Sequence, residues 1–503
     1  MPNSKPPPYG ANLLLVVLTL TPGLLNTSAM TSIAANVAHD LRAQVGLVLS
    51  LPLYSDAALA FGCVVAAEVL RRRDGRVLYL SLIVASILVS VGSAIAPAFS
   101  ALFAFHVAHG FLAGMLLITA LPPTFVSFPK QRVPTTVLVL VPALFGASTL
   151  APLAGALVAR SDAWRALFWI EALVGVLAFA LALHALRQRR PAAANAPIDF
   201  YAIGMSGLAT ILLYAGAGNL ATHDWTYLAA AIPFAAGLAA IVALLVGEAL
   251  RKAPLLPVKS MLRALPVIGL VATASGGAIF AANQQTALLL FANVARLDPV
   301  RAGIALSPEF ALAVVGGLLF AIGLRTRWLP AFTFAGLLAL GVGTVMLHLA
   351  LREHPGSGQI AAAMAVAALG AGLTVTPGLF IAALSVERAF VGGAIATLQL
   401  LRLTFSFVTA PGVEHTVLVH GTSPVALLRF IQSPQSIAPS NIPALRADLL
   451  AGMSAANGFV IAGTVLALLF VLVMFVRYGA FPRKPNLEAF LDRGKPAFET
   501  PRL

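Results

Sequence analysis

Charge is scarce in this sequence. Only 10% of the 503 residues are Asp, Glu, Lys or Arg, whereas 59% are apolar, counting Ala, Val, Ile, Leu, Met, Phe, Trp, Tyr and Cys. A soluble domain carries about 45–50% apolar and about 25% charged residues. So large an excess of apolar side chains cannot be hidden inside a water-facing globule. We therefore expect a protein that crosses a membrane many times.

Cysteine is almost absent. The single cysteine, Cys63, lies within an apolar run, so neither a disulfide framework nor a thiolate metal cluster can form within one chain. We interpret Cys63 as a small buried apolar residue. A cleavable signal peptide is not predicted either, because residues 1–10 are polar and proline-rich and the next apolar run is long enough for a full span.

Acidic residues are the rarer charges. The 18 Asp and Glu are outnumbered by 32 Lys and Arg, which gives a net charge of +14. Such a balance can indicate nucleic-acid binding, but here the basic residues occupy short gaps between apolar runs. We interpret them as topology signals and expect no nucleic-acid partner.

The sequence also lacks the motifs of energy-converting and catalytic domains. A phosphate-binding loop requires G-x-x-x-x-G-K-[ST], yet the only Gly-Lys pair, Gly494 and Lys495, is followed by Pro496. Neither H-E-x-x-H nor C-x-x-C occurs. We expect no cofactor, no metal site and no enzyme. A many-helix body without a nucleotide-binding domain is typical of a secondary transporter.

Fourteen apolar runs are long enough to cross a bilayer, which takes about 20 residues per helix. They cover residues 11–34, 46–69, 77–96, 99–121, 134–158, 166–186, 200–219, 227–249, 265–291, 304–324, 328–350, 360–384, 391–412 and 455–477.

The basic residues test this count through the positive-inside rule. If fourteen spans start from a cytoplasmic N-terminus, 23 of the 32 Lys and Arg lie on the cytoplasmic side, 8 lie outside, and Arg402 lies within a span. A missed span would scramble this alternation. We expect both termini in the cytoplasm and a multi-pass location in the cell membrane, for a bacterial protein the inner membrane.

The predicted organisation follows from the spans. We expect a cytoplasmic tail at 1–10, a six-helix bundle at 11–190, two inserted helices at 191–263 and five helices of a second bundle at 264–412. An external loop is predicted at 413–454, the last helix at 455–477, and a disordered cytoplasmic tail at 478–503.

Several stretches resemble motifs of the major facilitator superfamily. After the second span, residues 68–76 (EVLRRRDGR) resemble its gating-loop motif G-x-L-a-D-R-x-G-R. Leu70, Arg73, Gly75 and Arg76 carry the match. Glu68 and Arg72 stand where the family has glycine and aspartate.

Two further stretches resemble the fourteen-span drug:proton antiporter branch of this superfamily, the multidrug resistance transporters. In the fifth span, residues 151–155 (APLAG) keep Pro152 and Gly155 of a helix-bending motif. Residues 163–175 (AWRALFWIEALVG) are similar to the stretch entering the sixth span of that branch. The resemblance implies an all-α membrane fold of two six-helix bundles plus two inserted helices, with a substrate cavity between the bundles.

The chain departs from the family at two positions associated with proton coupling. The first span has Leu25, Asn26, Thr27 and Ser28 where the family has L-D-x-T. In the fourth span, the arginine and glutamine of R-x-x-Q-G are replaced by His106 and His109. A neutral amide thus replaces the acid, and a titratable ring replaces a permanent cation.

Ionisable side chains at membrane depth are functional candidates by default. Asp56 and His109 each lie ten residues from the outer ends of their spans, about 15 Å deep at 1.5 Å per residue. We expect them to form a proton-relay pair; the alternative is that each makes only a local polar contact. His106 shares a helix face with His109 and is a candidate for proton entry.

Other charged residues are secondary candidates. Glu171 and Glu309 are expected to reach water from near the outer ends of their spans. Arg402, near the midplane, could bind an anionic group or neutralise Asp56 or Glu309; a structural ion pair is the alternative. Glu68 and Glu248 are expected to pair with neighbouring arginines at the cytoplasmic ends of helices.

Polar residues of two spans are candidates for substrate contact. Asn26, Thr27 and Ser28 lie in the first span, and Asn283, Gln284 and Gln285 lie in the ninth. Both spans line the cavity in the superfamily that the chain resembles. The competing interpretation is hydrogen bonding between helices, which is common in membranes.

The sequence therefore predicts a transporter in contact with lipid, protons and a small-molecule substrate. It does not determine the oligomeric state, and a monomer is the favoured interpretation. The favoured function is proton-coupled efflux of small amphipathic or drug-like molecules. One alternative is an importer or facilitator of a specific organic solute. The other is a non-transporting membrane receptor or scaffold, against which the short loops argue.

Overall fold

The computed structural model describes residues 9–126, 129–186, 197–220, 227–352, 356–419, 426–427, 430–431, 437–478 and 484–498. Over these ranges the chain is helical and contains no strand. Fourteen helices are long and apolar enough to cross a membrane, which confirms the predicted number of spans. Most of the predicted tail at 1–10, and parts of the predicted segments at 413–454 and 478–503, lie outside the described residues.

The N-terminal half contains six of these helices. They are α1 (Tyr9–Asp40), α2 (Val45–Leu49) continuing into α3 (Leu51–Arg72), α4 (Gly75–Ala94), α5 (Phe99–Val126), α6 (Val133–Val141) continuing into α7 (Ala147–Arg160), and α8 (Arg165–Ala185). The short helix η1 (Lys130–Arg132) precedes α6, and the π-helical segment η2 (Pro142–Gly146) joins α6 to α7.

The inserted helices are α9 (Phe200–Leu220) and α10 (Leu228–Leu250), followed by the short α11 (Val258–Met261). The C-terminal half has α12 (Ala264–Leu289) with η3 (Leu290–Val294), α13 (Pro299–Leu306) with α14 (Pro308–Gly323), α15 (Leu329–Arg352), α16 (Ser357–Leu384), α17 (Val391–Val419) and α19 (Ile442–Tyr478). Between and beyond them lie η4 (Arg388–Phe390), η6 (Pro439–Asn441) and α20 (Leu487–Arg493).

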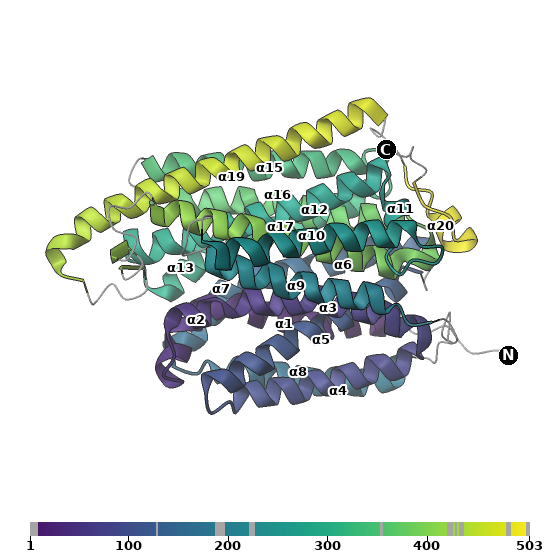
Figure 1. Cartoon of the computed structure of the whole chain (residues 1–503), viewed down its shortest axis with the longest axis horizontal. Coiled ribbons are helices and arrows are strands. Elements are labelled where there is room, and N and C mark those ends of the chain that lie inside the picture. The colour runs from purple at the N-terminus through teal and green to yellow at the C-terminus, as the bar shows by residue number, and fades with distance from the viewer. Residues whose placement is uncertain are drawn as a thin grey trace.

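The helices group into two bundles, with α9 of the inserted pair packed against both and α10 packed on α9 (Figure 1). In the N-terminal half, α1 packs on α7 and α8, α3 on α5, and α4 on α5 and α8. In the C-terminal half, α16 contacts α12, α14 and α15. The halves meet where α3 contacts α17 and where α6 and α7 contact α14 and α13. Helix α9 packs on both α3 and α17.

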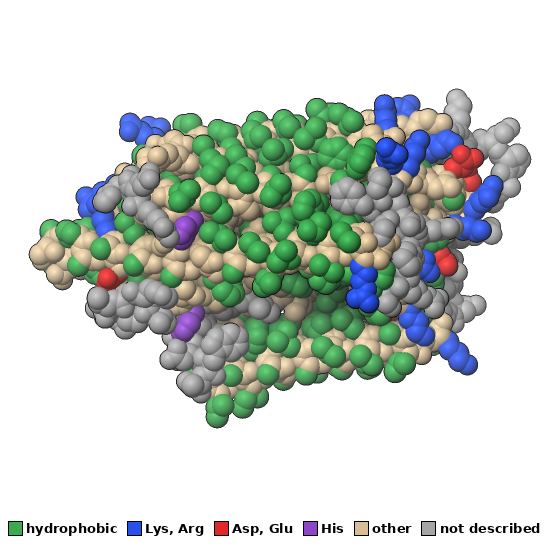
Figure 2. Space-filling model, turned by 90° about the horizontal axis from the view of Figure 1, so that it is seen from above, with side chains coloured by type: hydrophobic (Ala, Val, Ile, Leu, Met, Phe, Trp, Pro, Cys, Tyr) green, Lys and Arg blue, Asp and Glu red, His purple; other side chains and the backbone are tan. Residues whose placement is uncertain are grey.

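The outer surface suits lipid. Large apolar side chains point outward from many helices, such as Ile211 at 68% exposure and Leu466 at 67%. Figure 2 shows this apolar belt along the middle of the molecule, with Lys and Arg gathered toward the ends and most densely at the end that carries α20. The start of α1 lies at the same end (Figure 1), which we call the terminal face.

Two predicted segments differ from the structure. Helix α17 continues to Val419 and α19 begins at Ile442, so helix replaces both ends of the loop predicted at 413–454. The reason is packing, because a side chain at Gly452 of α19 would meet the carbonyl oxygen of Val417 at 2.4 Å. Backbones this close belong to helices in direct contact.

The C-terminal tail is ordered where the structure describes it. Helix α20 buries Phe490 and Leu491, and the backbone amide of Ala497 donates to the carbonyl of Leu384 at 2.7 Å. On the other side, Lys130 of η1 forms an ion pair with Glu488 at 2.7 Å. The expectation of a disordered tail was wrong because apolar side chains anchor it to the terminal face.

Candidate functional site

Three buried polar side chains meet inside the N-terminal half. The Nε2 atom of His109 on α5 lies 2.5 Å from Oε1 of Glu171 on α8. The amide of Asn26 on α1 donates to the other carboxylate oxygen, Oε2, at 2.6 Å. Their exposures are 6%, 9% and 3%. Both oxygens of one membrane carboxyl group are thus bonded, and we call these three residues the His109–Glu171 site.

A glycine on α1 makes this arrangement possible. A side chain at Gly23 would begin 2.7 Å from the ring of His109 and 3.3 Å from Oε1 of Glu171. Only a residue without Cβ therefore lets the imidazole approach α1 and reach across to α8. Asn26 lies three residues on, hence on the same face of α1, and also donates to the carbonyl of Leu167 at 3.2 Å.

The site can hold and exchange a proton. An imidazole 2.5 Å from a carboxyl group can share one proton with it or carry a second as an imidazolium. A charge at this depth is costly unless it is paired and hydrogen-bonded, and here the partner group and the Asn26 donor provide both. Protonation thus changes the charge of the site without leaving an isolated ion in the bundle.

The structure does not pair Asp56 with His109. Asp56 lies on α3, which contacts α17 of the other half, the helix that carries Arg402. Both side chains are half-buried. Arg402 also donates from Nε to Oε1 of Gln399 at 2.8 Å. Asp56 therefore lies on a helix of the contact between the halves, and its pairing with Arg402 stays a prediction.

Helix rotation explains this difference from the prediction. Helices α3 and α5 touch through small residues, because a side chain at Gly110 would lie 2.1 Å from the carbonyl oxygen of Ser55. One residue along a helix turns the side chain by about 100°. Since Ser55 and Gly110 face each other, Asp56 turns toward α17 and His109 turns toward α1.

His106 is buried in the same bundle. It is 1% exposed, and neither ring nitrogen has a hydrogen-bond partner among the described residues. Its ring centroid lies 6.3 Å from that of His109 in a stacked arrangement. The side chain is therefore sealed from the surface rather than placed at an entrance.

A second group of polar residues lies in the C-terminal half. Gln284 donates to Oε2 of Glu309 at 3.2 Å, and Asn283 donates to Oγ1 of Thr344 on α15 at 2.8 Å. Glu309 has no exposed surface, so the expectation that it reaches water was wrong. Glu171, at 9% exposure, is likewise held inward by its two partners.

The remaining candidates for substrate contact differ in exposure. Thr27 and Ser28 are half-buried and Gln285 is exposed. The amide groups of Asn26 and Asn283 instead form hydrogen bonds between helices. This agrees with the alternative interpretation, in which these residues join helices and do not contact substrate.

The gating-loop motif forms a small network at the terminal face. Glu68, 2% exposed, pairs with Arg72 at 2.5 Å and with Arg71 at 3.4 Å. After Arg73, the side chain of Asp74 accepts from the backbone amides at the start of α4. Gly75 opens that helix, and Arg76 donates to the carbonyl of Leu183 at the end of α8 at 3.1 Å.

The structure also shows where the helix-bending motif and Glu248 lie. Pro152 lies inside α7, and a side chain at Gly155 would lie 2.9 Å from the carbonyl oxygen of Ala29 on α1. This is the close approach expected of the helix-bending motif. Glu248 accepts from the backbone amides of Leu255 and Leu256 at 2.8 and 2.9 Å, and lies 3.6 Å from Arg251.

Sequence reasoning missed the partnership of His109, Glu171 and Asn26, although it had named each residue. The sequence feature that could have indicated this partnership is that all three are polar residues on helices of one bundle. It also missed Thr19 and Tyr79, whose hydroxyl groups are 2.8 Å apart. Among the described residues, no three His, Cys, Asp or Glu side chains form a group that could hold a metal ion.

Comparisons with known proteins support this architecture. No family model matches the chain. The chain is 25% identical over 406 residues, 78% of each protein, to an uncharacterized MFS-type transporter, YubD, of Bacillus subtilis.

Solved structures resemble the fold. The human organic anion transporter MFSD10 has a TM-score of 0.58 at 14% identity, covering 92% of this chain and 100% of its own. A POT family transporter in complex with a thioalcohol-conjugated peptide has a TM-score of 0.62 at 13% identity, with coverage of 92% and 96%. The proton:xylose symporter XylE has a TM-score of 0.52 at 14% identity, with coverage of 96% and 99%. The chain has the major facilitator fold, and these likenesses support a secondary transporter of the major facilitator superfamily rather than an enzyme.

Proposed function

We propose that this protein is a proton-coupled secondary transporter that exports small amphipathic molecules by alternating access. The observation that carries the proposal is the His109–Glu171 site, a buried imidazole–carboxyl pair bonded to Asn26 inside one bundle. In the proposed cycle, protonation of this pair alters the packing of α1, α5 and α8 and so biases which conformation is favoured. A ligand or proton shifts such an equilibrium only by its different affinity for the two states.

The substrate path in this proposal lies between the halves. Asp56 lies on α3 and Arg402 lies on α17, the two helices of this contact, so a change in it would uncover groups of both signs. This charge pair suits molecules that combine an apolar body with a polar or charged end. It belongs to a different interface from the His109–Glu171 site, so coupling between them must pass through movement of the helices.

Direction and location rest on sequence features. Export is supported by the resemblance of residues 151–155 and 163–175 to drug:proton antiporters. The excess of Lys and Arg at the terminal face (Figure 2) supports a cytoplasmic position for this face, and hence for both termini. We propose that the protein works as a monomer in the cell membrane, for a bacterial protein the inner membrane.

An importer or facilitator of one organic solute is the second candidate. The observation that favours it is Asn26, which occupies the place of the acid in the span-one motif of the antiporters. Under this alternative, the substrate equilibrates or enters without a requirement for the His109–Glu171 site. A receptor or scaffold is the third interpretation and predicts no flux.

The test is transport by the full-length protein in proteoliposomes. A panel of fluorescent amphipathic dyes would be followed under an imposed pH gradient and, separately, as exchange at equal pH. We expect dye movement opposite to the proton gradient. Glu171→Gln should abolish the gradient-driven component while leaving exchange, because an amide of the same shape cannot be ionised. Asp162→Asn is the matched control, an exposed acid of the same half that bonds Asn36 and should keep its gradient response.

Each alternative has its own outcome. Gradient-independent equilibration would favour a facilitator, and movement with the proton gradient would favour an importer. The absence of flux with every dye and gradient would favour the non-transport interpretation. Unchanged coupling in Glu171→Gln would reject the proposed site.

A further inference from the structure

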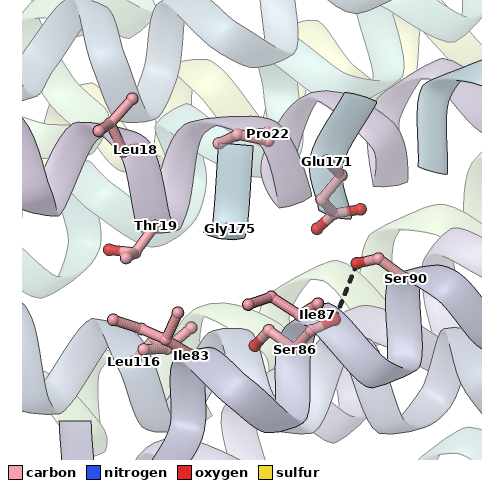
Figure 3. A pocket seen from close by; sticks show the side chains of 10 residues that line it. All are labelled: Leu18, Thr19, Pro22, Ile83, Ser86, Ile87, Ser90, Leu116, Glu171 and Gly175. Atoms are coloured by element: carbon pink, nitrogen blue, oxygen red, sulfur yellow. Dashed lines mark hydrogen bonds between the residues drawn. The ribbon is translucent and has the colours of Figure 1, made fainter. Parts of the chain in front are cut away.

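We infer that a chain of hydroxyl groups and water inside the N-terminal half carries protons between Glu171 and the terminal face, apart from the substrate path. The inference deepens the proposed function and rests on it. It starts from a partly open cavity lined by residues of α1, α4, α5 and α8. Glu171 and Gly175 line it from α8 and Thr19 from α1, while Ser86 and Ser90 line it from α4 (Figure 3).

The cavity is of the right size for water. About 20 Å³ is available to the centre of a water-sized sphere, and roughly 10–15 Å³ suffices for one water molecule that has two to four polar partners. Figure 3 shows the carboxyl group of Glu171 and the hydroxyl groups of Thr19, Ser86 and Ser90 around the same space. The hydroxyl of Ser90 donates to the carbonyl of Ser86 at 2.9 Å, which leaves its oxygen free to accept.

Toward the terminal face, the next two hydroxyl groups of the route, those of Thr19 and Tyr79, are hydrogen-bonded to each other. Oγ1 of Thr19 and the phenolic oxygen of Tyr79 lie 2.8 Å apart, and either can be the donor. When the hydroxyl of Thr19 donates to the carbonyl of Leu15 at 2.9 Å, Tyr79 is the donor, and rotation of the Thr19 hydroxyl reverses the bond. Tyr79 is 3% exposed and lies four residues after Gly75, where α4 begins. At 1.5 Å per residue this places it about 6 Å along the helix from that end. The route therefore comes to just over one helical turn from the start of α4 at the terminal face.

The proton balance of the route is simple. Glu171 releases its proton to a water molecule in the cavity, which passes one of its own protons to the oxygen of Thr19. Thr19 then gives its hydroxyl proton to Tyr79, and Tyr79 passes its phenolic proton on toward water at the terminal face. Each hydroxyl group regains a proton as it loses one, so one proton moves and no bond between heavy atoms changes.

This route is separate from the contact between the halves. All ten residues that line the cavity come from α1, α4, α5 and α8, which belong to the N-terminal half. Asp56 and Arg402 instead lie where α3 meets α17. A proton can therefore leave Glu171 while substrate occupies the space between the halves, so neither has to wait for the other.

The experiment removes the two hydroxyl groups with little change of shape. Thr19→Val, Tyr79→Phe and the double variant would be compared in proteoliposomes under a pH gradient and in exchange at equal pH. We expect the double variant to slow gradient-driven dye movement and the accompanying proton flux at least about tenfold, with exchange unchanged. The matched controls are Tyr201→Phe and Ser81→Ala, whose hydroxyl groups bond carbonyls outside the route, at Ala243 and Leu78.

A second variant tests the water step without touching the bonded pair. Ser86→Leu should fill the cavity and slow gradient-driven movement as well, since the side chain of Ser86 lines that space. Ser86→Leu also tests the route if the double variant does not fold. Wild-type coupling in the double variant, or in Ser86→Leu, would overturn the route while Glu171→Gln still showed that the proposed function holds. Unchanged coupling in Glu171→Gln would instead reject both the proposed function and the proposed proton route.

Discussion

Glu171 in the N-terminal half and Glu309 in the C-terminal half are both buried, but the two carboxyl groups have different partners. Glu171 in the N-terminal half meets the imidazole of His109 and the amide of Asn26. Glu309 in the C-terminal half meets only the amide of Gln284, and its Oε1 has no hydrogen-bond partner among the described residues. The difference indicates which site can respond to protons. The imidazole of His109 beside Glu171 can take up a proton, whereas the amide of Gln284 beside Glu309 cannot.

The first helices of the two halves differ in the same way. On α1, Gly23 leaves room for the ring of His109 to approach. On α12, which opens the C-terminal half, Asn283 is bonded to Thr344 on α15 and serves to join two helices. We interpret the N-terminal half as the half that responds to protons and the C-terminal half as the more static partner.

The largest effect is expected from Gly23→Ala. The added methyl group would lie 2.7 Å from a carbon and 2.9 Å from a nitrogen of the His109 ring, so the ring must move away from Glu171. We expect gradient-driven transport to fall at least about tenfold, equivalent to about 1.4 kcal/mol. Gly277→Ala on α12 is the matched control, because its methyl group would come no closer than 4.0 Å to Arg402. The comparison of the halves is wrong if the control loses coupling and Gly23→Ala keeps it.

A smaller effect is expected from Glu309→Gln. Glutamine has nearly the same shape, and no cationic side chain bonds to Glu309 among the described residues. The amide of Gln284 can turn to present its oxygen to the new side chain. We therefore expect both exchange and the response to a pH gradient to be retained, measured beside Glu171→Gln in the same proteoliposomes. A loss of gradient response equal to that of Glu171→Gln would place coupling in both halves.

The sequence was sufficient to predict the membrane helices, because the length of each apolar run is a local property, whereas the two-bundle fold was predicted from the family resemblance. Fourteen runs near the length of a bilayer predicted fourteen helices, and the structure has them at nearly the same positions. The ends of α17 and α19 were missed, since they depend on contact between Gly452 and Val417. Helix α20 was missed for the same reason, because Phe490 is buried only by the rest of the protein.

The candidate site was predicted in its members but not in its pairing. Depth along a helix can be counted from the sequence, and this placed Asp56 and His109 at one level. The direction of a side chain around the helix depends on which residues make the contact, and Ser55 against Gly110 set that direction for α3 and α5. In a membrane protein both faces of a helix are apolar, so periodicity gives no warning of this rotation.

Asn283→Ala should reduce stability rather than coupling. The substitution removes the hydrogen bond from Asn283 to Thr344, between α12 and α15. Bonds of this kind in membranes are worth about 0.6 to 2 kcal/mol. We expect a lower midpoint of thermal unfolding in detergent, with exchange and gradient response retained after reconstitution. Asn26→Ala tests the other half, where loss of the bond to Glu171 should disturb coupling as well as stability. Equal transport defects in the two variants would contradict the distinction.

The smallest effect on stability is expected from Glu488→Gln, at the point where the C-terminal tail contacts both halves. Lys130 of the N-terminal half donates to Glu488 at 2.7 Å, while Arg388 of the C-terminal half donates to the carbonyl of Leu491 at 2.6 Å. The Lys130–Glu488 pair is exposed, and such pairs contribute little to stability. Glu488→Gln should thus leave the midpoint of thermal unfolding at pH 7 unchanged, whereas Phe490→Ala should release the tail, because Phe490 is only 1% exposed.

The acid side of this pair has a defined pH dependence. The hydrogen bond from Lys130 lowers the pKa of the Glu488 carboxyl group, so its contribution is fully present above the ordinary glutamate pKa of about 4.3. It is lost only as the pH falls through the lowered pKa. Limited proteolysis of the tail should therefore be equally slow at pH 7 and pH 5 in the wild type, slightly faster in Glu488→Gln and much faster in Phe490→Ala. Equal cleavage rates in the two variants would show that charge, and not the buried ring, links the tail to both halves.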